Sequence, residues 1–546
     1  MRACAGPSSS RRNAMPISPI PRPYGLSMTH GSSRLADGDT IFTADVELRE
    51  IVGVFIADVI ADGGPVLAET RVLSTAQVVL ELVTSAELSA PAAEGLRADA
   101  ASLATPADER YGLEVDAHGV RLKASTREGI HRGLTTLRQL VASADGVVPF
   151  LRIQDGPRFS WRGLALDVVR TFHDPSTIRR VIDMCSLYKI NVLHLHLTDN
   201  EGWRLEVPGR PALTEIGGAG ARDGRPGGHL SAAEMAGLVA YATARFVTIV
   251  PEIDMPGHSA AALRAYPELA TLHEGTSSRS SGVIPDTLDH RNEGTWALVD
   301  DVLDAVVTQF PHSAYIHIGA DEVFGLPDDA YSWFVERAMT AVRARGRRVI
   351  GWQEMAAGPL TRHDAIQYWI DATPEEVAPM LNRLPAHRRD LLSVALEKSR
   401  TDIPNALAAG ARILVSPATR AYFDAPHTGS PLDPAQEKTR TRVGHSLYPP
   451  VSLRAGVDWD PVADTRDIQD ATQIAGVEAA IWSETITDRD DLEFMLLPRL
   501  CGIAEKAWSV HTSDWEEYAS RLAPQARAWT RRGWNWYRTD EIDWIL

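Results

Sequence analysis

Two adjacent carboxylates at the end of an apolar run are the residues of this sequence best placed to do chemistry. The segment YIHIGADE at residues 315–322 runs through small and apolar residues into Asp321 and Glu322. Neighbouring side chains of a strand point to opposite faces, so these two can share a pocket only where the strand ends and the chain turns. Carboxylates in one pocket push their pKa values apart, which leaves one ionised and one protonated. The pattern predicts acid–base chemistry, although a pair that caps the next helix would have the same sequence.

Other polar and aromatic residues follow short apolar runs in the same way. Eight such runs alternate with longer helical patterns, which is typical of repeated βα units and a parallel sheet. The runs cover residues 163–169, 191–198, 246–253, 315–318, 348–352, 365–369, 412–416 and 476–482. In a (β/α)8 TIM barrel the active site lies at the C-terminal ends of the strands. We therefore predict an α/β fold of this kind, with the functional residues gathered at that face.

Three tryptophans belong to this set of residues at the ends of predicted strands: Trp352, Trp369 and Trp482. A single Trp is more often part of a core, but three at strand ends predict flat apolar walls around a sugar-sized pocket.

The motifs of this region resemble, in their order, those of glycoside hydrolase family 20, the β-N-acetylhexosaminidases. The resemblance covers residues 111–537. It is carried by RGLALDVVR at 162–170, LHLHLTD at 193–199 with GWR at 202–204, VPEIDMPGH at 250–258, HIGADE at 317–322, GW at 351–352, SPAT at 416–419 with Tyr422 and Asp424, and WSE at 482–484. It implies an exo-acting, retaining glycosidase without cofactor or metal.

The resemblance also implies roles for three catalytic residues. Glu322 would protonate the departing glycosidic oxygen, and Asp321 would hold the N–H of the substrate's 2-acetamido group. Tyr422 would donate a hydrogen bond to the acetamido carbonyl, whose oxygen attacks C1 and forms an oxazolinium ion. Such substrate-assisted catalysis needs no nucleophile from the enzyme.

Eight further residues would bind or support the sugar. Arg170, Asp424 and Glu484 would bind its O3, O4 and O6 hydroxyls, which closes the pocket and makes cleavage exo-acting. Asp199 and His258 resemble the family's supporting pair, in which the imidazole orients the acid/base Glu322, although ordinary polar packing would explain them too. The three tryptophans complete the set. One departure is Asn200, where relatives often carry a second acidic residue; we interpret it as tuning the loop.

Ahead of the barrel, a different pattern indicates a small α+β accessory domain. Apolar and polar residues alternate over 40–52, 78–84, 111–115 and 120–124, a helical pattern covers 127–141, and DGP at 155–157 predicts a turn. We predict a disordered tail over residues 1–38, the accessory domain over 39–154 and the catalytic barrel over 155–546. Within the barrel, residues 371–409 are long for one crossover and predict extra helix or loop.

Composition restricts the partners. The 546 residues carry a net charge of −17, which repels nucleic-acid phosphates, and no apolar stretch approaches a membrane span. Three scattered cysteines, Cys4, Cys185 and Cys501, make neither a disulfide framework nor a zinc motif. Without an apolar segment after Arg12 we expect no secretory signal, and thus a cytoplasmic protein that acts on small-molecule or oligosaccharide substrates.

Two other classes of function compete with this interpretation. His194 and His196 have the spacing of a metal-binding strand pair, as in metal-dependent amidohydrolases, but the fifth and sixth runs offer Trp where further ligands are needed. A sugar-binding protein without activity would be expected to lack Asp321, Glu322 or Tyr422. The choice between GlcNAc and GalNAc, the natural glycan and the oligomeric state stay open.

Overall fold

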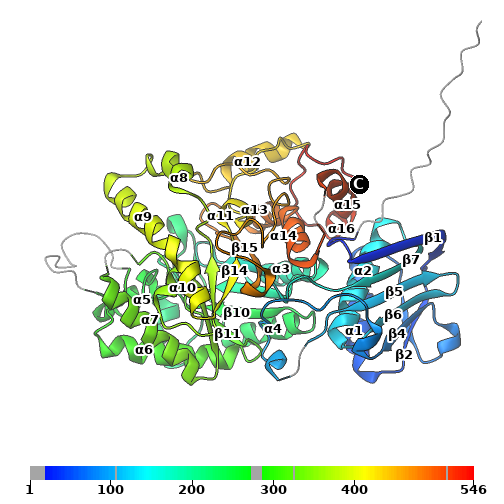
Figure 1. Ribbon diagram of the computed structural model, residues 1–546, viewed down its shortest axis with the longest axis horizontal. Coiled ribbons are helices and arrows are strands. Elements are labelled where there is room, and N and C mark those ends of the chain that lie inside the picture. Colours follow the sequence, from blue (N-terminus) through cyan, green and yellow to red (C-terminus); the bar gives the residue numbers. More distant parts are fainter. Residues whose placement is uncertain (1–18, 105–106, 272–285, 324–325, 512–513) are drawn as a thin grey trace, which may run out of the picture.

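A closed barrel of eight parallel strands forms the larger part of the protein (Figure 1). The computed structural model describes residues 19–104, 107–271, 286–323, 326–511 and 514–546. Around the barrel the strands follow one another in chain order: β8 (Trp161–Asp167), β9 (Val192–His196), β10 (Thr248–Glu252), β11 (Tyr315–His317), β12 (Arg348–Trp352), β13 (Ala365–Tyr368), β14 (Arg412–Val415) and β15 (Ile474–Ile481). Each of the eight predicted runs overlaps one of these strands, so the predicted (β/α)8 TIM barrel is confirmed.

The barrel interior is built in layers along its axis. An apolar layer near the N-terminal ends includes Val192, Val250, Tyr315, Ile350 and Ala365. Because strand side chains alternate with a period of two, the residue two places further along each strand points the same way. Those residues are His194, Glu252, His317, Trp352 and Gln367, all of them buried. The second layer of the core is therefore largely polar and lies directly beneath the strand ends.

Helices cover the outside of the barrel, and several start at side-chain caps. Asp174 accepts from the backbone N–H of Thr177, and Ser231 forms a capping box with Glu234. The main helices are α3 (Pro175–Leu187), α4 (Ala232–Thr243), α5 (Ala260–Ala265), α6 (Glu293–Gln309), α7 (Asp328–Ala344), α10 (Asp402–Ala408), α13 (Arg489–Leu496) and α14 (Arg499–Trp508). Cys185 on α3 and Cys501 on α14 are buried free thiols, and Cys4 lies outside the described residues.

Additional helices extend two of the connections. The predicted extra structure in residues 371–409 consists of α8 (Pro374–Leu381) and α9 (Ala386–Lys398), which precede α10. Short α11 (Ala418–Ala421) and α12 (Glu437–Arg442) lie between β14 and β15, and α15 (Trp515–Leu522) and α16 (Ala526–Arg531) follow the barrel. Figure 1 shows α8 and α9 projecting from the barrel on the side away from the N-terminal sheet.

A seven-stranded mixed sheet forms a separate N-terminal domain where the sequence predicts a small α+β domain with four strand segments. Its order is β1-β7-β5-β6-β4-β2-β3, and helix α2 (Arg127–Ser143) packs on it with α1 (Arg49–Ala61) alongside. The strands are β1 (Gly25–Arg34), β2 (Thr40–Thr43), β3 (Ala68–Thr70), β4 (Val78–Leu82), β5 (Tyr111–Asp116), β6 (Gly119–Ala124) and β7 (Val147–Asp155).

Two predictions for this domain are wrong. The strand predicted over residues 40–52 ends at Thr43, because the apolar residues Ile51, Val52, Phe55 and Val59 follow a helical spacing and start α1. The tail predicted over 1–38 contains β1, which pairs antiparallel with β7. The side chains of β1 are mostly exposed and polar, so its sequence has no alternating apolar pattern that would predict a strand. Backbone hydrogen bonds to the distant strand β7 hold it in place. Residues 1–18 of that predicted tail lie outside the described residues.

Buried ion pairs join the two domains. Glu109 accepts hydrogen bonds from Arg97 at 2.6 Å and Arg132 at 2.8 Å within the N-terminal domain, and from Arg162 of β8 at 3.0 Å. Trp508, at the end of α14, packs into the core of the N-terminal domain and donates to Asp155 at 3.0 Å. None of the helices in the described part of the chain is both long and apolar enough to cross a membrane.

Candidate active site

All eleven predicted site residues lie at or after the C-terminal ends of barrel strands. They come from every strand of the barrel: Arg170 after β8, Asp199 after β9, His258 after β10, Asp321 and Glu322 after β11, Trp352 at the end of β12, Trp369 after β13, Tyr422 and Asp424 after β14, and Trp482 and Glu484 after β15. Since the strands are parallel, these residues share one face of the barrel.

The turn after β11 brings Asp321 and Glu322 to one side of this face. Gly319, Ala320 and Glu322 have φ angles of 65°, 74° and 48°, a left-handed path that costs free energy in the two non-glycine residues. A Cβ on Gly319 would lie 1.7 Å from Oδ1 of Asp254, which itself accepts the backbone N–H of Ala320 at 3.1 Å. Helix α7 begins only at Asp328, so the pair does not cap it. The alternative interpretation as a helix cap is wrong.

One imidazole serves both carboxylates. Nε2 of His258 lies 3.7 Å from Oδ2 of Asp321 and 3.7 Å from Oε2 of Glu322. Its other nitrogen, Nδ1, lies 3.0 Å from Oδ1 of the buried Asp199. Burial alone would lower the pKa of His258, but Asp199, Asp254 and Asp321 together raise it well above its usual value. Carboxylates beside both ring nitrogens therefore favour the imidazolium form of His258.

The general acid candidate also has an unusual proton affinity. The loss of hydration at its partly buried position raises the pKa of Glu322, the positive charge of His258 opposes this, and the negative charge of Asp321 adds to it. A raised pKa keeps the Glu322 carboxyl group protonated at a higher pH than a free glutamate, which is what proton donation to a leaving group requires.

Aromatic rings line the neighbouring side of the site. The rings of Trp369 and Tyr422 are nearly parallel, with centroids 6.4 Å apart and an angle of 10°. Trp482 stands against Tyr422 at 6.1 Å and against Trp352 at 5.7 Å. Trp352 is only 1% exposed and donates its indole N–H to Glu252 at 2.9 Å, so it lies in the floor rather than the wall.

Four buried polar atoms of the site lack a hydrogen-bond partner among the described residues. They are Nε of Arg170, Oδ1 of Asp321, Oδ1 of Asp424 and Oε2 of Glu484. Buried polar groups in native proteins are nearly always hydrogen-bonded, because leaving one unsatisfied costs about 1–3 kcal/mol. Their concentration at one place indicates a polar ligand with several hydroxyl or amide groups.

Arg170 connects this group to the supporting pair. Its guanidinium lies 2.5 Å from Asp199, 3.4 Å from Asp167 and 3.4 Å from Glu201. The same guanidinium lies 5.3 Å from the Trp482 ring centroid. At the opposite end, burial and the charge of Glu484 raise the pKa of Asp424 well above its usual value.

Asn200, the departure from the family pattern, fastens a loop. Its side-chain oxygen accepts the backbone N–H of Ala260 at 3.1 Å, and its backbone oxygen accepts from Arg264 at 2.7 Å. These bonds tie the segment after β9 to helix α5.

Sequence reasoning assigned no role to Asp254, Glu354 and Tyr448, which also surround the site. Burial and the charge of Asp321 raise the pKa values of Asp254 and Glu354 well above normal. Glu354 accepts the indole N–H of Trp369 at 3.2 Å, and the Tyr448 ring meets that of Tyr422 at 6.1 Å. Asp254 and Glu354 lie one and two residues after predicted strands, and this position could have indicated that they belong to the site. No sequence pattern indicates Tyr448.

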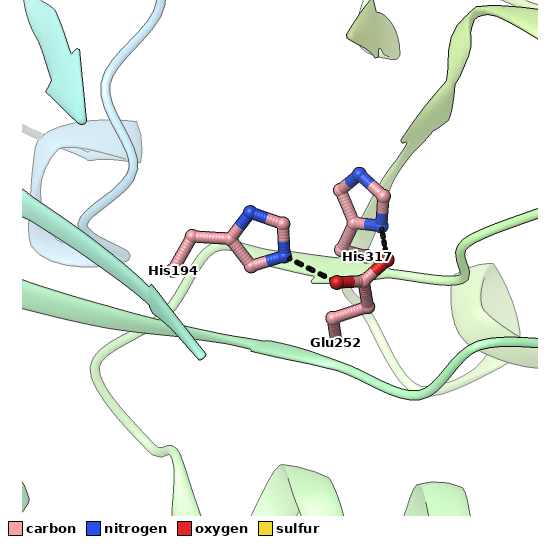
Figure 2. Close-up of side chains that lie close together, drawn as sticks. All are labelled: His194, Glu252 and His317. Atoms are coloured by element: carbon pink, nitrogen blue, oxygen red, sulfur yellow. Dashed lines mark ion pairs between the residues drawn. The ribbon is translucent and has the colours of Figure 1, made fainter. Parts of the chain in front are cut away.

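A cluster of metal-binding residue types lies beneath this site (Figure 2). Two nitrogens of His194 and His317 lie 3.1 and 3.0 Å from the carboxylate of Glu252, and the three side chains come from β9, β10 and β11. His317 is the third histidine that the amidohydrolase interpretation lacked. The same carboxylate also accepts from Trp352 at 2.9 Å and lies 2.6 Å from His196. Because the Glu252 carboxylate is already hydrogen-bonded to His196 and Trp352, and Nδ1 of His317 accepts the backbone N–H of Gly319 at 3.1 Å, these side chains fit a polar network better than a metal site.

Comparison with known proteins agrees with this geometry. Residues 159–327 and 325–511 match "Glycosyl hydrolase family 20, catalytic domain", and residues 18–156 match "Glycosyl hydrolase family 20, domain 2". A β-N-acetylhexosaminidase of Cellulomonas fimi is 36% identical over 538 residues, which cover 97% of each chain.

Solved structures show the same relationship. The GH20 β-N-acetylhexosaminidase of Streptomyces coelicolor A3(2) is 31% identical, with a TM-score of 0.79 over 97% of this chain and 99% of that one. The N-acetyl-β-hexosaminidase of Streptomyces plicatus, solved with Thio-NAglucal, is also 31% identical, with a TM-score of 0.80 over 98% and 99% of the two chains. Both parts of the sequence match the same family, and the family's fold carries the site, so this chain belongs to glycosyl hydrolase family 20 and is a glycoside hydrolase.

Proposed function

We propose that this β-N-acetylhexosaminidase removes terminal, non-reducing β-linked GlcNAc or GalNAc one residue at a time, with retention of configuration and through an oxazolinium intermediate. The observation that supports this best is the shared position of Asp321 and Glu322, each 3.7 Å from one imidazole nitrogen. Retaining enzymes with their own nucleophile place two carboxyl groups on opposite sides of the sugar ring. Two adjacent carboxylates suit a different division of labour, in which the substrate supplies the nucleophile.

In this mechanism Glu322 donates its proton to the glycosidic oxygen as the bond to C1 breaks. The acetamido carbonyl oxygen attacks C1 from the other face, and positive charge spreads over the new ring. Asp321 has an unpaired Oδ1 that can accept the acetamido N–H, and its negative charge stabilises the cation that forms. The Tyr422 hydroxyl would hold the carbonyl oxygen in position for attack. Water then opens the ring, with Glu322 as general base.

Binding of the terminal sugar would use Arg170 and the unpaired carboxylate oxygens of Asp424 and Glu484. Arg170, Asp424 and Glu484 can each hydrogen-bond a sugar hydroxyl, while Trp369 and Trp482 offer ring faces to the apolar side of the pyranose. Held on all its hydroxyls, the sugar could only be the end of a chain, which makes cleavage exo-acting. A mutant of the Streptomyces plicatus enzyme was solved with GlcNAc as product, which supports a sugar of this kind as ligand.

The test compares substrates that differ only at C2. A p-nitrophenyl β-glucoside lacks the attacking carbonyl, so we expect it to turn over at least about 10³-fold more slowly than the p-nitrophenyl β-N-acetylglucosaminide. A thiazoline mimic of the bicyclic intermediate should inhibit at concentrations far below KM. Similar cleavage of both substrates, together with no inhibition by the thiazoline, would show that the enzyme has a nucleophile of its own.

A further inference from the structure

Glu252 is the hub of the polar layer inside the barrel. It is 0% exposed, and its two oxygens lie within hydrogen-bond distance of four side chains: His194 at 3.1 Å, His196 at 2.6 Å, His317 at 3.0 Å and Trp352 at 2.9 Å. Strand pairing sets this arrangement, because Glu252 is in register with His196 on β9 and with His317 on β11. Figure 2 shows His194 and His317 pointing to the Glu252 carboxylate from the two flanking strands.

From this hub a continuous row of acidic groups and imidazoles leads to the candidate active site. His196 contacts Glu252 through Nδ1 at 2.6 Å and Asp199 through Nε2 at 2.8 Å. Asp199 in turn contacts His258 at 3.0 Å, and His258 lies beside Asp321 and Glu322. In the opposite direction, His194 joins Glu252 to the buried Glu478, whose carboxylate lies 2.9 Å from Nδ1 of His194.

The arrangement determines the charges. An imidazole with a carboxylate on each ring nitrogen can donate to both only when both nitrogens carry protons. His194 and His196 are each in this position. Against the effect of burial, their carboxylate neighbours raise the pKa of His194 to about 9 and that of His196 well above its usual value. Carboxylates and imidazoles therefore alternate from Glu478 to His258.

We propose that Glu252 is a positioning residue for the reaction: it holds His196 as an imidazolium ion, which fixes the Asp199 carboxylate and, through it, His258 beside the two catalytic carboxylates. This inference rests on the proposed function, in which Glu322 is the general acid. Glu252 itself is too deep to touch substrate. Its effect reaches the reaction only through His196, Asp199 and His258.

Other charged groups lie next to this row of carboxylates and imidazoles, and they influence how far the pKa of Glu322 would shift if Glu252 lost its charge. The acidic groups near His196 besides Glu252 are Asp167, Asp199 and Asp254, and Arg170 lies on Asp199. Those around His258 are Asp199, Asp254, Asp321 and Glu322, and His317 and His194 face Glu252.

Removal of the Glu252 charge shifts the basic limb of the pH–activity profile in opposite directions, depending on whether His196 then loses or keeps its second proton. If His196 depends on Glu252 for its second proton, it becomes neutral, and Asp199 keeps only Arg170 and His258 as positively charged neighbours. Glu322 then keeps its proton to higher pH, and the basic limb of the pH profile moves up. If His196 stays charged without Glu252, only a negative charge is lost, and the limb moves down or stays.

The experiment compares Glu252→Gln with Glu478→Gln in the full-length enzyme. Both substitutions remove one buried carboxylate bonded to His194, but Glu478 lies one imidazole further from Asp199. For E252Q we expect kcat to fall about 10- to 100-fold with KM within about threefold, because misorientation acts on the chemical step. Its basic limb should move up by about half a unit or more, and E478Q should show a clearly smaller loss and shift. An unmoved or lowered limb in E252Q, or equal effects of the two variants, would overturn the proposal.

A second measurement applies if E252Q does not fold. Nitrogen-15 NMR of histidine-labelled wild-type enzyme, with His196→Asn to assign the signal, should show His196 doubly protonated at pH 8. A neutral His196 at that pH would overturn the proposal without any variant of Glu252. The comparison of glucoside with N-acetylglucosaminide uses only wild-type enzyme, so the proposed function and this inference can fail separately.

Discussion

At the scale of single residues, the adjacent carboxylates Asp321 and Glu322 lie in different surroundings, which suit them to different roles. Glu322 is at the open side, with 36% of its side chain exposed, while Asp321 is 14% exposed and has an unpaired buried oxygen. His258 lies between Asp199 and both of them, so its positive charge is shared. The raised pKa of Glu322 suits proton transfer, and the unpaired oxygen of the more buried Asp321 suits acceptance of a substrate N–H.

Replacement of Glu322 by Gln tests the first duty. We expect turnover of substrates with poor leaving groups to fall by about 10²- to 10⁴-fold, while activated aryl glycosides, which need little protonation, lose far less. Wild-type activity should decline as pH rises through the raised pKa of Glu322, because only the protonated form acts, and this basic limb should be absent in E322Q. Kinetics of both substrate types across pH measure this; equal losses of a few-fold would remove Glu322 as the acid.

Replacement of Asp321 by Asn tests the second duty. We expect kcat to fall by about 10²-fold or more with a smaller change in KM, since the negative charge is needed mainly as the oxazolinium ion forms. The exposed Asp329 on α7 offers a matched control, and D329N should behave as wild type. Unchanged turnover in D321N would exclude Asp321 from the mechanism.

At the scale of elements, buried arginines hold the loops that carry the site. Arg499 on α14 donates to the backbone oxygens of Phe423 and Ala425 at 2.7 and 2.6 Å, on both sides of Asp424. Arg204 donates to the backbone oxygen of Val168 at 3.1 Å, just ahead of Arg170. A planar guanidinium satisfies several carbonyls at once, so an irregular loop can be buried without losing hydrogen bonds.

The buried carboxyl group of Asp402 is linked through Gln353 to the loop that carries Trp369. Burial raises the pKa of Asp402, on α10, to about 6, although it accepts from Gln353 at 3.0 Å. Gln353 in turn accepts the backbone N–H of Trp369 at 3.1 Å. The pKa of Asp402 is higher in the folded than in the unfolded state, so ionisation of this carboxyl group lowers the free energy of unfolding. The loss is absent below about pH 4, where the group is protonated in both states, and largest above about pH 6.

We therefore expect Asp402→Asn to raise the free energy of unfolding at pH 8 by about 1–3 kcal/mol and to have little effect at pH 4. Urea unfolding at the two pH values measures the difference. A destabilised variant at pH 8 would mean that the ionised carboxylate is better accommodated than its burial indicates.

At the scale of the whole molecule, the N-terminal domain and the barrel share a buried charged interface. Glu109 accepts from Arg97, Arg132 and Arg162, and those arginines, against the effect of burial, lower the pKa of its carboxyl group. The segment before β1 adds to it, since the backbone N–H groups of Ile20 and Arg22 are donated to Gln139 of α2 and Glu505 of α14. The chain's two domains are thus expected to unfold together.

Glu109→Gln tests this interface. Loss of the Glu109 charge leaves the buried Arg162 without an acidic partner among the described residues, while Arg97 and Arg132 keep Glu128, so we expect the free energy of unfolding at pH 7 to fall by about 3–5 kcal/mol. The lowered pKa means that this contribution is present above the unfolded pKa and disappears as pH falls through the folded one, so wild type and variant should converge in acid. Denaturant titrations measure it, with Glu114→Gln, from the exposed pair with Arg152, as the control expected near zero. A loss no larger than that of E114Q would contradict the prediction.

The barrel and the positions of the candidate site residues at its strand ends could be predicted from the sequence alone. Strands of a parallel barrel are short apolar runs, and the active-site residues of such barrels lie at their C-terminal ends. The positions of Asp199, Asp321 and Trp482 at strand ends could therefore be predicted from local pattern alone. The order of the motifs then identified the family.

Contacts that depend on pairing between distant segments could not be predicted from local sequence. The edge strand β1 is held by backbone bonds to β7 more than a hundred residues away, and its polar side chains carry no periodic signal. Glu252 meets His196 and His317 because three strands align in register, and His194 and His196, which suggested a metal site in the sequence, contact its carboxylate. Local sequence records which residues a strand contains, but register and barrel closure determine which of them meet inside it.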